Sequence, residues 1–256
     1  IMAGNPMTNK SLYRAIRFMV HDATIAIDFP DGSRTLILRE IELDRASVHA
    51  RADNVHGYSD FTPESGLAGD RDVGAAQAAA ECLKRGGIEK VIGDRTLPLL
   101  YVDMIRSVGI EVELDSNIGV LDRRVKDAEE IAHLKKAQQI TEEAMQMACQ
   151  TVAHAQVDAD GMLQVDETPL TSERLRIMID AFLLARNFEN VPSIVAGGRD
   201  GGDCHFLGSG TLHTGQPVII DIFPVDKDTL YHGDCTRTVV HGAVPAEISK
   251  MHAAVV

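Results

Sequence analysis

Short blocks of apolar residues separated by polar turns occupy the first half of the chain and favour a small α/β unit. Two β-like blocks, Ala23–Phe29 and Arg34–Glu40, flank a Pro30-Asp31-Gly32 turn signal, which predicts a hairpin. An alanine-rich block ended by two glycines predicts a helix over Asp72–Arg85. Alternating strands and helices at this spacing predict part of a parallel sheet. The remaining elements expected here are strands at Lys90–Gly93 and Ile110–Leu114 and a helix from Pro98 to Val108.

The second half begins after a charged segment, Asp122–Lys126, which is interpreted as the joint between two domains, 1–121 and 122–256. Behind this segment, apolar residues recur at steps of three and four and predict one face of a long helix. A second helix is expected at about Ser172–Arg186, after a polar loop. The expected apolar face of the first helix consists of Ile131, Leu134, Ala137, Ile140, Ala144 and Met147.

Two strands near the end of the chain each carry an aspartate. Pro217–Phe223 is a buried-type β block interrupted by Asp221, and Tyr231–Gly242 contains Asp234. A tight turn midway between the two aspartates would make them direct cross-strand neighbours on one face. Facing carboxylates destabilise a sheet unless a cation neutralises them, so the pattern fits a metal-binding pair. Two ordinary strand-end aspartates remain the alternative.

A glycine-rich segment, Gly197–Gly210, precedes these strands and contains one histidine, His205. No Gly-Lys-Ser/Thr follows the glycines, so the segment does not read as a phosphate-binding loop. From the pattern alone, this segment is either a functional loop or a mobile surface loop whose histidine is incidental.

Composition excludes several classes of protein. The 256 residues contain 25 Lys and Arg against 38 Asp and Glu, a formal net charge of −13, which argues against general nucleic-acid binding. No apolar run approaches the length of a membrane span, and no apolar leader region is visible at the start. No two of the four cysteines form a CxxC pair, which excludes a zinc knuckle or dithiol motif and, without a leader, favours the cytoplasm. They are Cys82, Cys149, Cys204 and Cys235.

The segment IVAGGRDGGDCHFLGSGTLHTGQPVIIDIFP, followed by YHGDCTRTVVHG, resembles the pita-bread metallopeptidases, which include methionyl aminopeptidase, aminopeptidase P and prolidase. The preceding KDAEEIAHLKKAQQITEEAM resembles the helix that opens the catalytic domain of aminopeptidase P and prolidase, so the resemblance runs from about Asp122 to His252. It implies an α/β N-terminal domain of the creatinase type over 1–121. An α+β pita-bread catalytic domain follows over 122–256.

The resemblance also assigns roles to individual residues. Asp221 and Asp234 would be the first two ligands of a site for two divalent metal ions, with Mn²⁺ favoured and Co²⁺ or Zn²⁺ possible. His205 would contact the substrate and stabilise the transition state. Thr236 would support the metal ligands, and Arg237 would hold the frame of the site. The expected reaction is removal of an N-terminal residue that precedes proline from a peptide substrate, by a homodimer.

Two departures from the family pattern keep other functions open. The two aspartates are 13 residues apart, which is slightly longer than usual for the family. Because the difference is an even number of residues, the two side chains would still face each other across the strands. The family's other three ligands, one His and two Glu, have no counterpart before Val256, so the catalytic domain is expected to be incomplete at its C-terminus. The alternatives are a creatinase-type amidinohydrolase that works without metal and a non-catalytic binding protein with the same fold.

Overall fold

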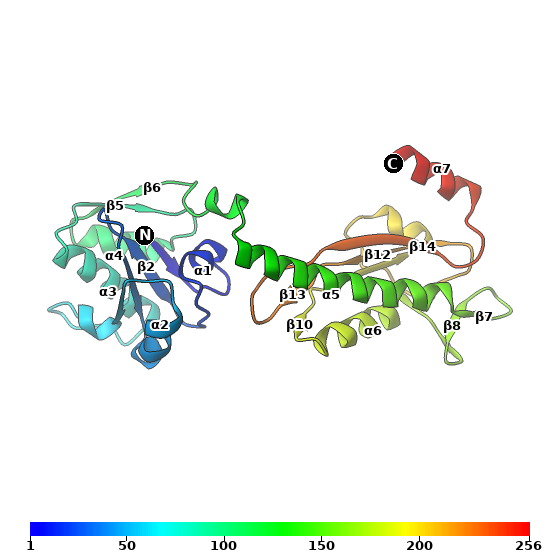
Figure 1. Cartoon of the computed structure of the whole chain (residues 1–256), viewed down its shortest axis with the longest axis horizontal. Helices are drawn as coiled ribbons and strands as arrows, with labels where there is room; N and C mark the ends of the chain where they lie inside the picture. The colour runs from blue at the N-terminus through cyan, green and yellow to red at the C-terminus, as the bar shows by residue number, and fades with distance from the viewer. The chain divides into compact units, whose positions relative to one another are not determined.

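The computed structural model describes all residues, 1–256, and divides into two compact units, Ile1–Lys126 and Asp127–Val256. Each unit has its own hydrophobic core and is described by itself. In Figure 1 the first unit runs from blue to green and the second from green to red. No helix is both long enough and apolar enough to cross a membrane.

A four-stranded sheet forms the centre of the first unit, in the order β1-β2-β3-β4. The first three strands pair antiparallel, and β4 joins β3 in parallel. The predicted hairpin is confirmed, with Ile25 opposite Ile37 across the turn. The strands are β1 (Met2–Gly4), β2 (Thr24–Asp28), β3 (Arg34–Leu38) and β4 (Asn54–Gly57).

Helices pack on this sheet, and a separate parallel pair of strands accompanies them. The alanines of α3 are buried in one cluster with Ile25 and Ile37, because small side chains let the helix approach the sheet closely. The predicted parallel pair is confirmed as β5 (Lys90–Gly93) and β6 (Glu111–Leu114). The helices are α1 (Lys10–Ile16), α2 (Leu43–His49), α3 (Arg71–Arg85) and α4 (Leu99–Ser107), with 3₁₀ turns at Glu40–Glu42, Tyr58–Phe61 and Asp122–Arg124.

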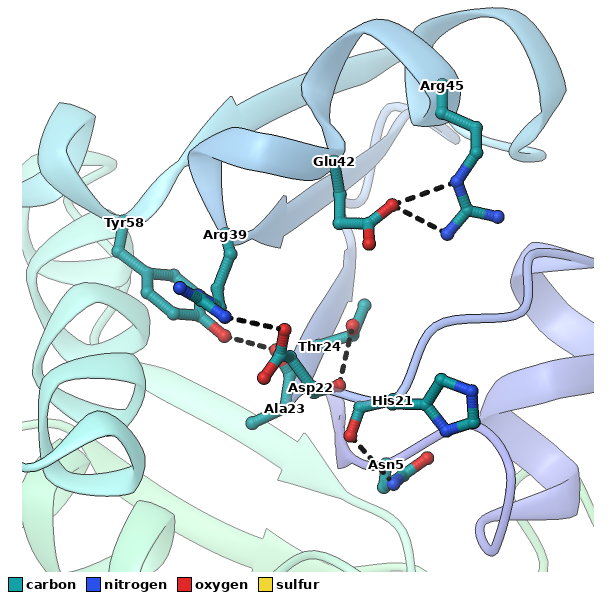
Figure 2. A network of polar contacts seen from close by, with 9 residues as sticks. All are labelled: Asn5, His21, Asp22, Ala23, Thr24, Arg39, Glu42, Arg45 and Tyr58. Carbon is teal, nitrogen blue, oxygen red and sulfur yellow. Dashed lines mark hydrogen bonds and ion pairs between the residues drawn. The ribbon is translucent and has the colours of Figure 1, made fainter.

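A polar network closes one end of the four-stranded sheet (Figure 2). The Tyr58 hydroxyl donates to the carbonyl of Ala23, and Arg39 pairs with Asp22 at 3.0 Å. Burial raises the pKa of the Tyr58 hydroxyl, so it stays protonated and remains a donor. These bonds tie the start of β2 to the segments that follow β3 and β4.

The second unit opens with the long helix that the sequence predicts. α5 (Ala128–Ala153) starts at a capping box in which Asp127 and Glu130 each accept the other's backbone N–H at 2.9 Å. Its buried face differs from the predicted one at the N-terminal end, where Ile131 is 44% exposed. The fully buried positions follow the small side chains of Ala137, Thr141, Ala144 and Ala148.

A three-stranded antiparallel sheet, β11-β12-β14, carries the candidate site residues. α5 lies along β12 and β14 (Figure 1), and α6 packs on β11. Val218, Ile220 and Ile222 of β12 are buried in the core, whereas the intervening Ile219 and Asp221 are only half-buried. Side chains alternate between the faces of a strand, so Asp221 points away from the core face.

The remaining elements of this unit are short. They are β7 (Gln156–Val157), β8 (Leu163–Val165), β9 (Thr168–Pro169), α6 (Ser172–Leu184), β10 (Phe188–Glu189), β11 (Ile194–Gly197), a 3₁₀ turn η4 (Gly198–Gly202), β12 (Pro217–Ile222), β13 (Val225–Asp226), β14 (Cys235–Val240) and α7 (Ala246–Val255).

Candidate functional site

The hairpin formed by β12 and β14 sets the geometry of the candidate site. Asp221 lies directly opposite Thr236, and Ile194 of β11 lies on its other side. Directly opposed residues of an antiparallel pair project from the same face. The Thr236 hydroxyl accordingly donates a hydrogen bond of 2.5 Å to Oδ1 of Asp221.

The predicted direct pairing of Asp221 with Asp234 is wrong by two residues. The connection is a wider loop, in which Asp226 N–H donates to Tyr231 O at 3.0 Å and Leu230 N–H donates to Asp226 O at 2.8 Å. No Asn-Gly or Asp-Gly is available for a two-residue turn. The loop instead uses Leu230 in the left-handed region, at φ 60°, and an Asp226 carboxylate that accepts from Asp228 N–H at 2.9 Å.

Asp234 nevertheless lies on the same face as Asp221, as a diagonal neighbour. Its two chain neighbours, Gly233 and Cys235, are both buried, and Gly233 faces α5 so closely that a Cβ there would lie 2.0 Å from Thr141 Oγ1. Asp234 directly precedes β14, and the same register continues to the Val225–His232 bridge, so the alternation of the strand extends to Asp234 and points it away from α5, to the side of Thr236 and Asp221. A register shift of two residues, from Asp234 to Thr236 as the partner of Asp221, is even and preserves the face.

α5 fixes the backbone that carries Asp234. The Asp234 N–H donates to Gln138 Oε1 at 3.1 Å, and the glycine before it allows the strand to lie against the Ala137 carbonyl. The predictions from sequence contain neither Gln138 nor Gly233 as a supporting residue. A glycine directly before a candidate ligand is the one local signal of such close approach.

The two carboxylates have no basic partner. Asp221 accepts only the Thr236 hydroxyl, and the side chain of Asp234 has no hydrogen bond or ion pair. The negative charge of these carboxylates affects the pKa of the neighbouring Cys235 thiol. Burial is the largest cause of its raised pKa. The Arg237 charge opposes this effect, and the carboxylates of Glu142, Asp234 and Asp221 raise the pKa further. This thiol therefore stays protonated at neutral pH.

Two carboxylates and a supporting hydroxyl on one face fit part of an oxygen-rich site for a divalent ion. No group of three or more His, Cys, Asp or Glu side chains in the 256 residues is placed to hold a metal. The oxygen donors of this site therefore have the right chemistry for a divalent ion. They are too few to hold one, so further ligands are needed.

His205 lies in the loop that follows η4 and is exposed. The backbone N–H of His205 donates to Asp203 Oδ1 at 3.0 Å, and its ring Nδ1 lies 3.7 Å from Cys204 Sγ. The structure shows no contact between His205 and either aspartate. η4 itself packs on the face of Asp221, because a Cβ on Gly201 would lie 2.8 Å from Ile219 Cδ1.

Arg237 is placed apart from the other candidate residues. It lies opposite Ile220, on the face of the sheet turned away from Asp221. Its Nη1 donates to the carbonyl of Thr236 at 2.7 Å. The structure thus brings together Asp221, Asp234 and Thr236, and leaves the predicted roles of His205 and Arg237 without a direct contact.

Residues 132–256 match the model of Metallopeptidase family M24. This match covers nearly all of the second unit, and the pita-bread fold predicted for that unit is confirmed. The creatinase type of the first unit stays a prediction. No curated protein sequence matches the chain.

Solved structures resemble the chain in fold at low sequence identity. The Xaa-Pro dipeptidase from Bacillus anthracis matches at a TM-score of 0.74, 17% identity, over 98% of this chain and 63% of its own. The X-Pro aminopeptidase from Thermotoga maritima matches at 0.71, 17% identity, over 98% and 65%. The prolidase from Pyrococcus horikoshii matches at 0.69, 17% identity, over 98% and 63%. The chain thus spans a little under two thirds of the length of these structures.

Proposed function

We propose that this protein is a metal-dependent exopeptidase that removes an N-terminal residue preceding proline. The observation that supports this function best is the pair of carboxylates, Asp221 and Asp234, on one face of the β12–β14 hairpin without a basic partner. Uncompensated carboxylates on one sheet face are unfavourable unless a cation joins them. The M24 match over the same residues supports a peptidase.

Asp221 and Asp234 would bind two divalent ions together with ligands from elsewhere in the protein, with Mn²⁺ as the favoured metal and Co²⁺ or Zn²⁺ as alternatives. Such ions supply a bound water of lowered pKa, and hence hydroxide near neutral pH. Thr236 holds Asp221 Oδ1 through its hydroxyl and leaves Oδ2 free to bind. Arg237 would hold the frame of the site by fixing the Thr236 carbonyl.

His205 would donate a hydrogen bond to the carbonyl oxygen of the scissile peptide bond as negative charge develops there. The substrate is a peptide whose second residue is proline. The tertiary amide at the proline nitrogen has no N–H, so the substrate site needs no hydrogen-bond acceptor at that position. A homodimer is part of the same proposal and rests on the resemblance alone.

The test uses protein expressed from its complete gene, purified without metal and reloaded with Mn²⁺. Xaa-Pro dipeptides and Xaa-Pro-Xaa tripeptides are compared with the corresponding Xaa-Ala peptides, and creatine is assayed in parallel. We expect Mn²⁺-dependent release of the N-terminal residue from the proline peptides. We expect Asp221→Asn and Asp234→Asn to abolish it, and Asp228→Asn, at the exposed hairpin tip, to retain it.

Other outcomes would favour the alternatives. Metal-independent hydrolysis of creatine would support the amidinohydrolase. Absence of hydrolysis of every substrate by the metal-loaded protein would support a non-catalytic binding protein. Unchanged peptide hydrolysis in both aspartate variants would contradict the assignment of the metal ligands.

A further inference from the structure

The loop that carries His205 is fastened to α6 by an arginine. Arg176 donates from Nη1 to the carbonyl of Leu207 and, at 2.9 Å, to the carbonyl of Gly208. Only 16% of the Arg176 side chain is exposed. A charged donor in this largely buried position forms stronger hydrogen bonds than a neutral donor would. The two carbonyls lie two and three residues after His205 along the loop.

A glutamate on the same helix holds the end of that loop. Both carboxylate oxygens of Glu173 accept the Gly210 N–H at 3.2 Å, and Oε1 lies 3.9 Å from Arg176 Nη2. The pKa of Glu173 lies below its usual range. The largest cause is a hydrogen bond from its own backbone N–H, and the Gly210 N–H and the Arg176 charge lower it further. The carboxylate is therefore ionised at neutral pH and remains an acceptor.

The opposite side of the loop is fastened to β11. Val195 N–H donates to the Leu207 carbonyl at 3.0 Å. Gly208 has φ +81°, and a Cβ there would lie 1.8 Å from Val195 O, so only glycine fits this close approach. β11 in turn pairs with β12, where Val195 lies opposite Ile220, the residue before Asp221. A continuous series of contacts thus links α6, the His205 loop and β12, the strand that carries Asp221.

We propose that Arg176 and Glu173 are positioning residues, which fix the loop of His205 against the strand that carries Asp221. The proposal rests on the proposed function for the role of His205. Neither side chain touches the aspartates or His205. They act on the backbone two to five residues after His205, and this limits where the imidazole can lie.

The test compares three substitutions. Arg176→Gln removes the charge and shortens the side chain, Arg176→Lys keeps a charged nitrogen donor without the planar guanidinium, and Arg174→Gln is the matched control. Arg174 lies on the same helix and donates to the carbonyls of Val165 and Thr168, both at 2.8 Å, on the β8–β9 side instead of the loop. Amide hydrogen exchange, resolved by residue, reports how often the loop opens.

We expect Arg176→Gln to speed exchange at the Val195 and Gly210 amides by about tenfold or more, as loss of two charge-assisted hydrogen bonds implies. Arg176→Lys should fall between Arg176→Gln and the wild type, and Arg174→Gln should leave both amides unchanged. In peptide hydrolysis, Arg176→Gln should lower kcat by about tenfold and leave KM within about twofold, because the loss affects the transition state.

Two results would overturn the proposal: unchanged exchange in a folded Arg176→Gln protein, or equal acceleration at the loop in Arg174→Gln. If Arg176→Gln does not fold, Glu173→Ala replaces it, and faster exchange at Gly210 with lowered kcat is then required. A wild-type protein that hydrolyses no peptide would contradict the proposed function. The exchange data would still decide whether α6 fixes the loop.

Discussion

Thr236 faces Asp221 directly across the β12–β14 hairpin, and its hydroxyl donates to Asp221 Oδ1 at 2.5 Å. This contact orients a half-buried carboxylate that has no other partner among the side chains around it. Hydrogen bonds to ligating carboxylates tune metal sites strongly. The geometry therefore gives Thr236 a specific effect on metal affinity.

Replacing Thr236 by valine keeps the shape of the side chain and removes the donor. We expect Thr236→Val to weaken Mn²⁺ binding by about 10–100-fold, the range seen when such supporting contacts are lost. Thr236→Ser keeps the hydroxyl and should bind within about threefold of the wild type. Calorimetric titration of metal-free protein measures both affinities. Equal binding by the valine variant would show that this hydroxyl does not support a ligand.

Gly233 is required by the close approach of the hairpin to α5. A Cβ at this position would lie 2.0 Å from Thr141 Oγ1 and 2.6 Å from the Ala137 carbonyl, and the backbone atom cannot move away without distorting the helix. We expect Gly233→Ala to lower the free energy of unfolding by about 1–3 kcal/mol through overpacking. Chemical denaturation measures this loss.

Gly202→Ala is the control for that experiment, because a Cβ at Gly202 meets nothing within 4 Å. Its stability should stay within about 0.5 kcal/mol of the wild type. A Gly233→Ala protein as stable as the control would mean that the hairpin does not lie against α5.

The elements that the sequence predicts best are long or strongly patterned. α5 begins with a capping box and α3 is rich in alanine, and both form where the pattern predicts them, although the buried face of α5 differs at its N-terminal end. The sequence does not predict the short strands β7, β8, β9, β10 and β13, because two or three residues carry no periodicity. Pairing with segments distant in sequence, not local preference, creates these strands.

The candidate site was predicted correctly in its face and incorrectly in its register. The turn residue Leu230 adopts a left-handed conformation that its residue type does not signal, so the loop is wider than a two-residue turn. Because the error is two residues, Asp221 and Asp234 still project to the same side. The supporting residues on α5 and α6 could not be found this way, since helix–strand contacts depend on packing between distant segments.

A buried carboxylate beneath the hairpin loop gives a further test. Asp226 is fully buried and pairs with Lys136 Nζ at 2.7 Å, while the lysine side chain is 53% exposed. Lys136→Met leaves this carboxylate without its cation, and we expect a loss of about 1–3 kcal/mol in the free energy of unfolding. Lys136→Met with Asp226→Asn should recover part of it, since the buried charge is then gone.

Thermal unfolding and denaturant titration measure this double-mutant cycle. The matched single change is Lys135→Met, because Lys135 lies next to Lys136 on the helix and forms no ion pair. A Lys136→Met protein as stable as Lys135→Met would contradict the stabilising role of the pair.

Cys82 in the first unit makes stability depend on pH. Burial raises its pKa from 9.0 to about 11, an effect that the nearby Arg85 charge partly opposes. The unfolded thiol loses its proton first as pH rises, so its contribution to stability is intact below pH 9 and is lost between pH 9 and about 11. We expect wild-type protein to lose up to about 2–3 kcal/mol more than Cys82→Ala over this window. Identical pH profiles of the two proteins would show that the thiol ionises equally well in the folded state.

The binding of Mn²⁺ by Asp221 and Asp234 is tested by the metal content of protein from the complete gene after equilibration with Mn²⁺ and dialysis. We expect about two ions per chain for the wild type and for Asp228→Asn, as in a two-metal hydrolytic site. Asp221→Asn and Asp234→Asn should each retain less than about one. Equal metal content in all four proteins would contradict the assignment of these aspartates as ligands.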